Sequence, residues 1–149
     1  MKKIILIATA VTCSLLLQAQ DVFNFTFNHM ALSVKDVHAS ADFYKNVLQL
    51  TEIINRTGHP ARRWFSLGED KELHLLSDLK EPVTINKAVH LALTTKNFDA
   101  FVNRLREMKI TFSDWPGKPN TVNIRADGIK QVFFQDIDGY WIEVNSVKE

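Results

Sequence analysis

Two stretches of this chain align with each other without a gap, and this internal repeat limits the possible folds more than any other feature. Residues 28–48 (NHMALSVKDVHASADFYKNVL) lie over residues 89–109 (VHLALTTKNFDAFVNRLREMK), with His29 on His90. Each stretch starts with the alternation typical of a strand and continues with apolar residues at helical spacing. Asp36 and Asn97 stand where helix N-caps are expected. The chain therefore contains the same strand–helix unit twice.

A second pair of segments extends the repeat. Residues 64–76 (WFSLGEDKELHLL) lie over residues 133–145 (FFQDIDGYWIEVN), and both read as strand, polar turn, strand. This register places His74 on Glu143. Residues 50–57 and 110–115 are expected to supply one further strand each. The predicted fold class is α+β: two βαβββ modules, about 25–79 and 86–147, form a cupped, mostly antiparallel sheet with helices on its outer face.

The extra residues of the second half fall in a long predicted loop, WPGKPNTVNIRADGIK (115–130), whose prolines and glycines interrupt regular structure. Long loops in small domains often cover a site. Trp115 and Arg125 make this segment a candidate lid.

The first twenty residues differ from the rest. A basic head is followed by an apolar stretch, Ile4 to Leu17, too short to span a bilayer comfortably, and then by small and polar residues. This layout predicts a signal peptide over residues 1–20 and an exported protein, periplasmic or secreted. Cys13 is the one cysteine and the alternative site of a lipid anchor. Cleavage would leave a mature chain, residues 21–149, without thiols, which excludes thiolate ligands and disulfides.

Charge argues for a small partner. The formal net charge of the whole chain is +1, and the sequence has no basic run and no glycine-rich phosphate loop. Nucleic acid is therefore not an expected partner. A small molecule is expected instead, and no membrane contact is expected after cleavage of the signal peptide.

Strand alternation places four polar side chains on one face of the predicted sheet, away from the helices. They are His29, His74, His90 and Glu143. Their neighbours on this face of the two first strands are small: Ala31, Ser33, Ala92 and Thr94. Three imidazoles and a carboxylate with free space around them indicate a cavity that holds a metal ion.

Four segments resemble the vicinal oxygen chelate superfamily, which contains glyoxalase I, bleomycin-resistance proteins and extradiol dioxygenases. They are NHMALSVKDVHASADFYKNVLQL, RRWFSLGEDKELHLL, VHLALTTKNFDAFVNRLREMKI and QVFFQDIDGYWIEV. The resemblance covers residues 25–147. The chain departs from the family pattern at Gln49, where glycine is common, and at Ile137, where proline usually precedes Asp-Gly. Both are changes at the level of the backbone.

The resemblance implies one divalent metal ion (Zn, Ni, Fe, Mn or Co) bound by His29, His74, His90 and Glu143, with Glu143 as the catalytic base. His74 is either a ligand or a residue that contacts substrate, because related proteins with a His-His-Glu triad lack this fourth ligand. Glu72 is a rival ligand. The candidate lining residues are Trp141, Glu72 and Arg63, since one of Arg62 and Arg63 must point into the cup.

The expected function is that of a metal-dependent lyase or isomerase acting on a small oxygenated compound that chelates the metal through two oxygens. Two alternatives stay open: an extradiol-type dioxygenase, and a metal-free binding protein of the bleomycin-resistance type. His74 and the signal peptide argue against glyoxalase I itself. The resemblance further implies a homodimer, in which the modules pair within one chain or between two chains.

Overall fold

The computed structural model describes residues 25–79 and 81–147. The predicted signal peptide and Cys13 lie outside these residues. The elements, in chain order, are β1 (His29–Ser33), α1 (Val37–Asn46), β2 (Glu52–Ile53), β3 (Arg62–Gly68), β4 (Lys71–Leu76), β5 (His90–Thr95), α2 (Phe98–Glu107), β6 (Asn123–Ile124), β7 (Lys130–Gln135) and β8 (Trp141–Ser146). The expected order of strand, helix and three strands therefore occurs twice.

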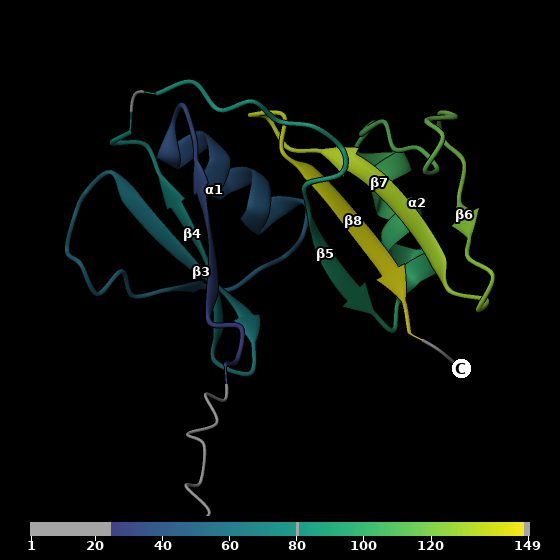
Figure 1. Cartoon of the computed structure of the whole chain (residues 1–149), viewed down its shortest axis with the longest axis horizontal. Helices are drawn as coiled ribbons and strands as arrows, with labels where there is room; N and C mark the ends of the chain where they lie inside the picture. The colour runs from purple at the N-terminus through teal and green to yellow at the C-terminus, as the bar shows by residue number, and fades with distance from the viewer. Residues whose placement is uncertain (1–24, 80, 148–149) are drawn as a thin grey trace, which may run out of the picture.

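Each module is one four-stranded mixed sheet. The strand orders are β1-β4-β3-β2 and β5-β8-β7-β6. The first strand of each module pairs in parallel with the last, and the other pairs are antiparallel. The two modules lie side by side, each with its helix, and the connection between β4 and β5 crosses from one to the other (Figure 1). The predicted α+β class and its two βαβββ modules are confirmed.

One face of each sheet packs against the helices. The side chains on this face include Leu32, Phe65, Leu73 and Leu75 in the first module and Leu91, Val132, Phe134, Ile142 and Val144 in the second, all buried. Helix α1 contributes Val37, Ala41 and Tyr44, and α2 contributes Phe98, Val102 and Leu105. These residues form one continuous core through both modules. Burying a side chain of this size contributes about 1.5–3 kcal/mol each.

Two local expectations differ from the structure. Residues 110–115 form no strand, and Ser113 makes only isolated bridges to Phe133 and Pro119. The second strand of the second module is β6, inside the expected loop. The reason is a turn at Asp114, whose carboxylate accepts hydrogen bonds from the amides of Gly117 and Lys118. Asn97 makes no side-chain cap, whereas Asp36 accepts hydrogen bonds from the amides of His38 and Ala39, as expected.

A buried hydrogen bond links the two modules. The Tyr44 hydroxyl, on α1, donates to Oδ2 of Asp136 in the β7–β8 turn at 2.8 Å. Burial raises the pKa of both groups. Ser40 donates to Asp138 in the same turn at 2.6 Å, and Tyr140 donates to the carbonyl of Ser33 at 2.8 Å. The turn therefore holds the second module against α1.

No helix within the described residues combines the length and the apolar character that crossing a membrane requires.

Gln49 occupies a backbone conformation that favours glycine, with φ of 55°, and Lys109 has the equivalent conformation in the second module. Left-handed backbone costs an ordinary residue about 1–2 kcal/mol. We therefore expect Gln49→Gly to raise the free energy of unfolding by about 1 kcal/mol in urea denaturation. Gln49→Ala keeps the Cβ atom and should give no such gain. Equal stabilities for the two variants would contradict this explanation.

Loss of the Tyr44–Asp136 hydrogen bond should destabilise the protein by more than Gln49→Gly stabilises it. Tyr44→Phe leaves a buried carboxylate oxygen without its donor, so the free energy of unfolding should fall by about 2 kcal/mol. Tyr140→Phe removes a half-buried bond to a carbonyl and should cost about 1 kcal/mol. Urea denaturation compares the two variants, and a Tyr44→Phe protein as stable as the wild type would show that the bond does not hold the modules together.

Candidate metal centre

The two sheets bring the candidate ligands to matching positions. In the first module His29 lies opposite Glu72 and Ala31 opposite His74. In the second module His90 lies opposite Trp141 and Ala92 opposite Glu143. The strand registers thus reproduce the sequence repeat, and all four candidate ligands lie on the sheet face opposite the helices.

In the second module, His90 and Glu143 form a close pair. Nε2 of His90 is 2.7 Å from Oε2 of Glu143, and Glu143 is buried. Nδ1 of His90 lies 2.9 Å from the carbonyl oxygen of Lys87. Because a carbonyl only accepts hydrogen bonds, Nδ1 carries the proton, and a neutral ring presents its Nε2 lone pair to Glu143. A lone pair facing a carboxylate requires a proton or a cation shared between them.

Glu143 has a second partner. Nε2 of Gln131, on the neighbouring strand β7, donates to Oε1 of Glu143. One carboxylate oxygen is thus held in place by a neutral side chain, and the other faces His90. A hydrogen-bonded carboxylate beside an oriented imidazole is the usual form of a metal-ligand pair and its supporting shell.

The first module arranges its two histidines differently. Nδ1 of His29 is 2.7 Å from Oδ1 of Asn28, so its Nε2 also carries the lone pair. The His29 ring stacks on the His74 ring at 4.3 Å, and His74 stacks on Trp64 at 3.9 Å. Trp64 carries the Arg56 guanidinium on its ring at 4.7 Å.

The His74 ring pairs with a carboxylate on its own strand. Nε2 of His74 is 2.7 Å from Oε2 of Glu72, and the Arg56 guanidinium binds the other oxygen of Glu72 at 2.7 Å. The hydrogen bond from His74, followed by that from Arg56, lowers the pKa of Glu72. His74 and His90 thus each direct Nε2 at a carboxylate, Glu72 in the first module and Glu143 in the second.

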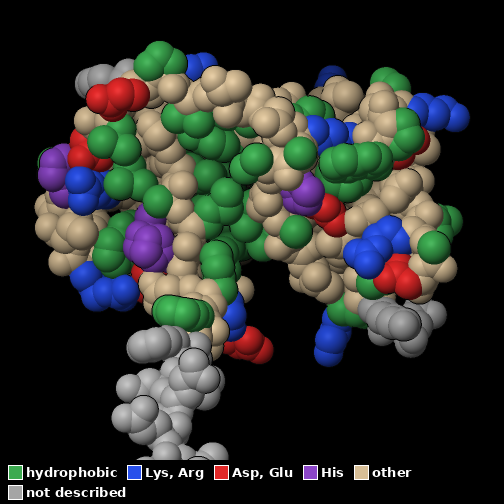
Figure 2. Space-filling view, in the orientation of Figure 1, with side chains coloured by type: hydrophobic (Ala, Val, Ile, Leu, Met, Phe, Trp, Pro, Cys, Tyr) green, Lys and Arg blue, Asp and Glu red, His purple; other side chains and the backbone are tan. Residues whose placement is uncertain are grey.

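The two pairs do not meet within one chain. Among residues 25–79 and 81–147, no three or more His, Cys, Asp and Glu side chains come together in an arrangement that could hold a metal ion. Histidine side chains are visible on both modules from one side of the molecule, and hydrophobic side chains fill the space between them (Figure 2). Each module thus carries part of the predicted ligand set.

A match to a family model shows which superfamily the chain belongs to. The model described as the Glyoxalase/Bleomycin resistance protein/Dioxygenase superfamily matches residues 26–144. The chain belongs to this superfamily. The match spans both modules and all four candidate ligands, and it confirms the resemblance seen in the sequence.

Individual relatives within the superfamily are distant. The metallothiol transferase FosB of Staphylococcus epidermidis is 25% identical over 126 residues, which cover 80% of each chain. Among solved structures, a glyoxalase/dioxygenase from Nostoc punctiforme has a TM-score of 0.66 and 26% identity, covering 87% of this chain and 99% of that one. Lactoylglutathione lyase from Agrobacterium tumefaciens has a TM-score of 0.61 and 20% identity, covering 83% and 94%, and shares the fold.

The candidate lining residues do not all lie on the sheet face of the candidate ligands. Trp141 shares the face of His90, and Glu72 shares that of His74. Arg63 lies on the helix side of β3, where it binds Glu52 at 2.5 Å and approaches His38. The hydrogen bond and the charge of Arg63 lower the pKa of Glu52. The ligand face of β3 instead receives Trp64.

Sequence reasoning missed four residues that border the pairs: Trp64, Lys87, Gln131 and Phe133. Trp64 lies opposite His74, and Phe133 lies opposite Glu143, in the two strand registers. Strand alternation alone would have placed Trp64, Gln131 and Phe133 on the ligand face. No comparable signal points to Lys87, because it lies in the turn before β5.

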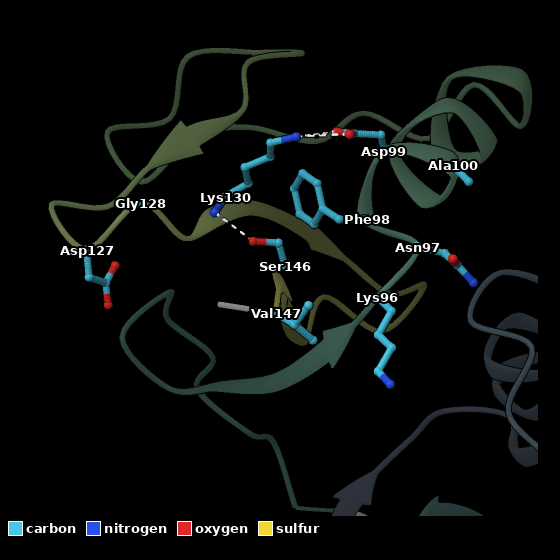
Figure 3. A pocket seen from close by; sticks show the side chains of 10 residues that line it. All are labelled: Lys96, Asn97, Phe98, Asp99, Ala100, Asp127, Gly128, Lys130, Ser146 and Val147. Atoms are coloured by element: carbon cyan, nitrogen blue, oxygen red, sulfur yellow. Dashed lines mark hydrogen bonds and ion pairs between the residues drawn. The ribbon is translucent and has the colours of Figure 1, made fainter. Parts of the chain in front are cut away.

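A polar pocket at the start of α2 is separate from these groups. Lys130 binds the carboxylate of Asp99 at 2.9 Å, and its amide donates to Ser146 at 3.1 Å (Figure 3). None of its lining residues is a candidate ligand.

Proposed function

We propose that this protein is an exported, metal-dependent enzyme of the glyoxalase superfamily that acts on a small oxygenated compound. Its metal ligands are His29, His90 and Glu143. The name of the relative FosB, a metallothiol transferase, supports metal chemistry in this branch of the superfamily. The predicted signal peptide supports export.

The His90–Glu143 pair is the observation that carries the proposal. The Lys87 carbonyl orients the His90 ring, and Gln131 holds one carboxylate oxygen of Glu143. The other oxygen, Oε2, lies 2.7 Å from Nε2 of His90. This donor set suits a borderline divalent ion such as Zn, Ni, Fe, Mn or Co. The pair lies on the sheet face opposite the core, and its two donor atoms are oriented by neighbouring groups, as metal ligands commonly are.

A bound divalent ion would polarise two neighbouring oxygens of the substrate. Glu143 is the best-placed general base, because its Oε2 is not held by Gln131 and faces the site. In an isomerase reaction Glu143 would take a proton from the carbon beside one polarised oxygen and return it to the neighbouring carbon; in a lyase reaction it would take the proton while the leaving group departs from the neighbouring carbon. Ring cleavage by a dioxygenase and metal-free sequestration of a ligand are the two competing functions.

His74 acts in the first module by supporting His29. Its Nε2 binds Glu72, and its ring lies between Trp64 and His29. These contacts favour a role in orienting the His29 ring over a role as a fourth ligand. Glu72, paired with Arg56 and His74, is likewise a supporting group.

The separation of the two pairs favours a ligand set completed by a second copy of the chain. The groove between the modules, lined by β1, β5 and the connection between β4 and β5, is mainly apolar. Leu79, Val83 and Val89 line it and are each more than half exposed. A homodimer in which module 1 of one chain faces module 2 of its partner would bury this surface and bring His29 to the His90–Glu143 pair.

Metal uptake tests the proposal. Protein purified without chelator and loaded with Ni²⁺, Zn²⁺, Mn²⁺ or Fe²⁺ should bind about one ion per chain in elemental analysis. Glu143→Gln should weaken binding at least about tenfold, because it removes a charged ligand. Glu107→Gln, an exposed substitution on α2, should leave binding unchanged. Failure to take up any of the four ions would leave metal-free sequestration as the remaining function.

Mixing two defective variants tests the shared site. His29→Ala and Glu143→Ala should each bind metal poorly. After partial unfolding and reassembly together, about a quarter of the sites should recover, because each mixed dimer contains one site with all three ligands intact. No recovery, together with tight binding by the wild type, would show that one chain closes its own site.

A further inference from the structure

Lys87 connects the proposed metal centre to the long loop of the second module. It lies in a turn just before β5, where the amide of Val89 donates to the carbonyl of Asn86 at 3.1 Å. Its own carbonyl accepts the hydrogen bond from Nδ1 of His90. Its backbone position is therefore tied to the histidine.

The Lys87 ammonium binds three consecutive residues, Ser113 to Trp115, where the chain enters the long loop. It donates to the carbonyl oxygens of Asp114 at 2.6 Å and Trp115 at 2.9 Å, and to the hydroxyl of Ser113 at 3.3 Å. An ammonium has three N–H donors, so these bonds use all of them. Lys87 thus cannot donate to a substrate while the loop holds this conformation.

Three aromatic rings surround the same ammonium. The Lys87 nitrogen lies 4.5 Å from the centre of the Phe133 ring, 4.9 Å from Trp141 and 5.4 Å from Trp115. These are cation–π distances. Loss of solvent around the ammonium lowers the pKa of Lys87.

The rings also border His90. The Trp115 ring lies 6.3 Å from the His90 ring, edge on, and the Phe133 ring lies 5.8 Å from it. Phe133 and Trp141 are fixed by strands β7 and β8, whereas Trp115 lies in a loop and is half exposed. Trp115 is therefore the one of these three rings that no strand holds; it contacts the Phe133 ring at 5.4 Å, and its carbonyl is bound by Lys87.

We propose that Lys87 is a positioning residue that fixes the Trp115 indole beside the His90–Glu143 pair and so limits the size of the molecule that can reach the metal. The size limit rests on the proposed metal-dependent function. The position of Trp115 does not depend on a bound metal. Lys87 itself makes no contact with the reacting atoms.

The first test uses metal-free protein labelled with 5-fluorotryptophan, in which Trp115→Phe identifies the Trp115 signal by ¹⁹F NMR. Lys87→Met keeps the aliphatic chain but removes the charge and the three donors. It should shift the Trp115 signal toward that of free fluorotryptophan and leave the Trp64 signal in place. Lys118→Met removes one charge from the same loop and should change neither signal.

Two results of this test would overturn the inference. An unmoved Trp115 signal in Lys87→Met would show that the loop holds its place without the ammonium. An equal displacement of the Trp64 signal, in the other module, would show that Lys87 supports overall stability instead.

The second test measures size selection at the metal. Acetohydroxamate and the bulkier benzohydroxamate both chelate through two neighbouring oxygens, and their binding to Co²⁺-loaded protein can be followed by the visible spectrum. Lys87→Met should improve binding of benzohydroxamate relative to acetohydroxamate by about fivefold. An unchanged ratio would overturn the size limit. Failure of the protein to bind Co²⁺ would count against the proposed function, and the metal-free ¹⁹F result would still decide the role of Lys87.

Discussion

The parallel pairing of the first and last strands of each module is the constraint on which the site depends. β1 and β4 are separated in the chain by a helix and two strands, as are β5 and β8, yet each pair lies side by side in register. This pairing alone brings His90 near Glu143 and His29 near His74. It also turns the apolar side chains of all four strands toward the helices, so the ligand face and the core form together.

The duplicated scaffold carries different chemistry in its two halves. His74 and Glu143 occupy the same position, but His74 is engaged by a carboxylate on its own strand, whereas Glu143 faces a histidine across the strand pair. An aromatic ring lies opposite each of them, Trp64 in one module and Phe133 in the other. The second module thus pairs its histidine with a carboxylate on the neighbouring strand, and the first module pairs His74 with Glu72 and stacks its ring on His29.

Much of the fold followed from pattern. The repeat, the alternation of strands and the Asp36 cap predicted the order of elements and the face that each candidate ligand occupies, because these depend on local periodicity. Local turn chemistry was harder to read. Asp114 forms a turn with Gly117 and Lys118, so the second strand of the second module forms at Asn123–Ile124 instead of at 110–115.

The amino-acid order alone was enough to predict the two modules and the four polar positions on one face, since side-chain direction in a strand alternates regardless of what packs around it. Only the tertiary structure decided what each position does. The contacts of Lys87 with the Trp115 loop and of Tyr44 with Asp136 join residues that no periodicity relates. Such contacts depend on how separate elements pack, because the free energy of a polar contact is set by burial and by the partner that packing supplies.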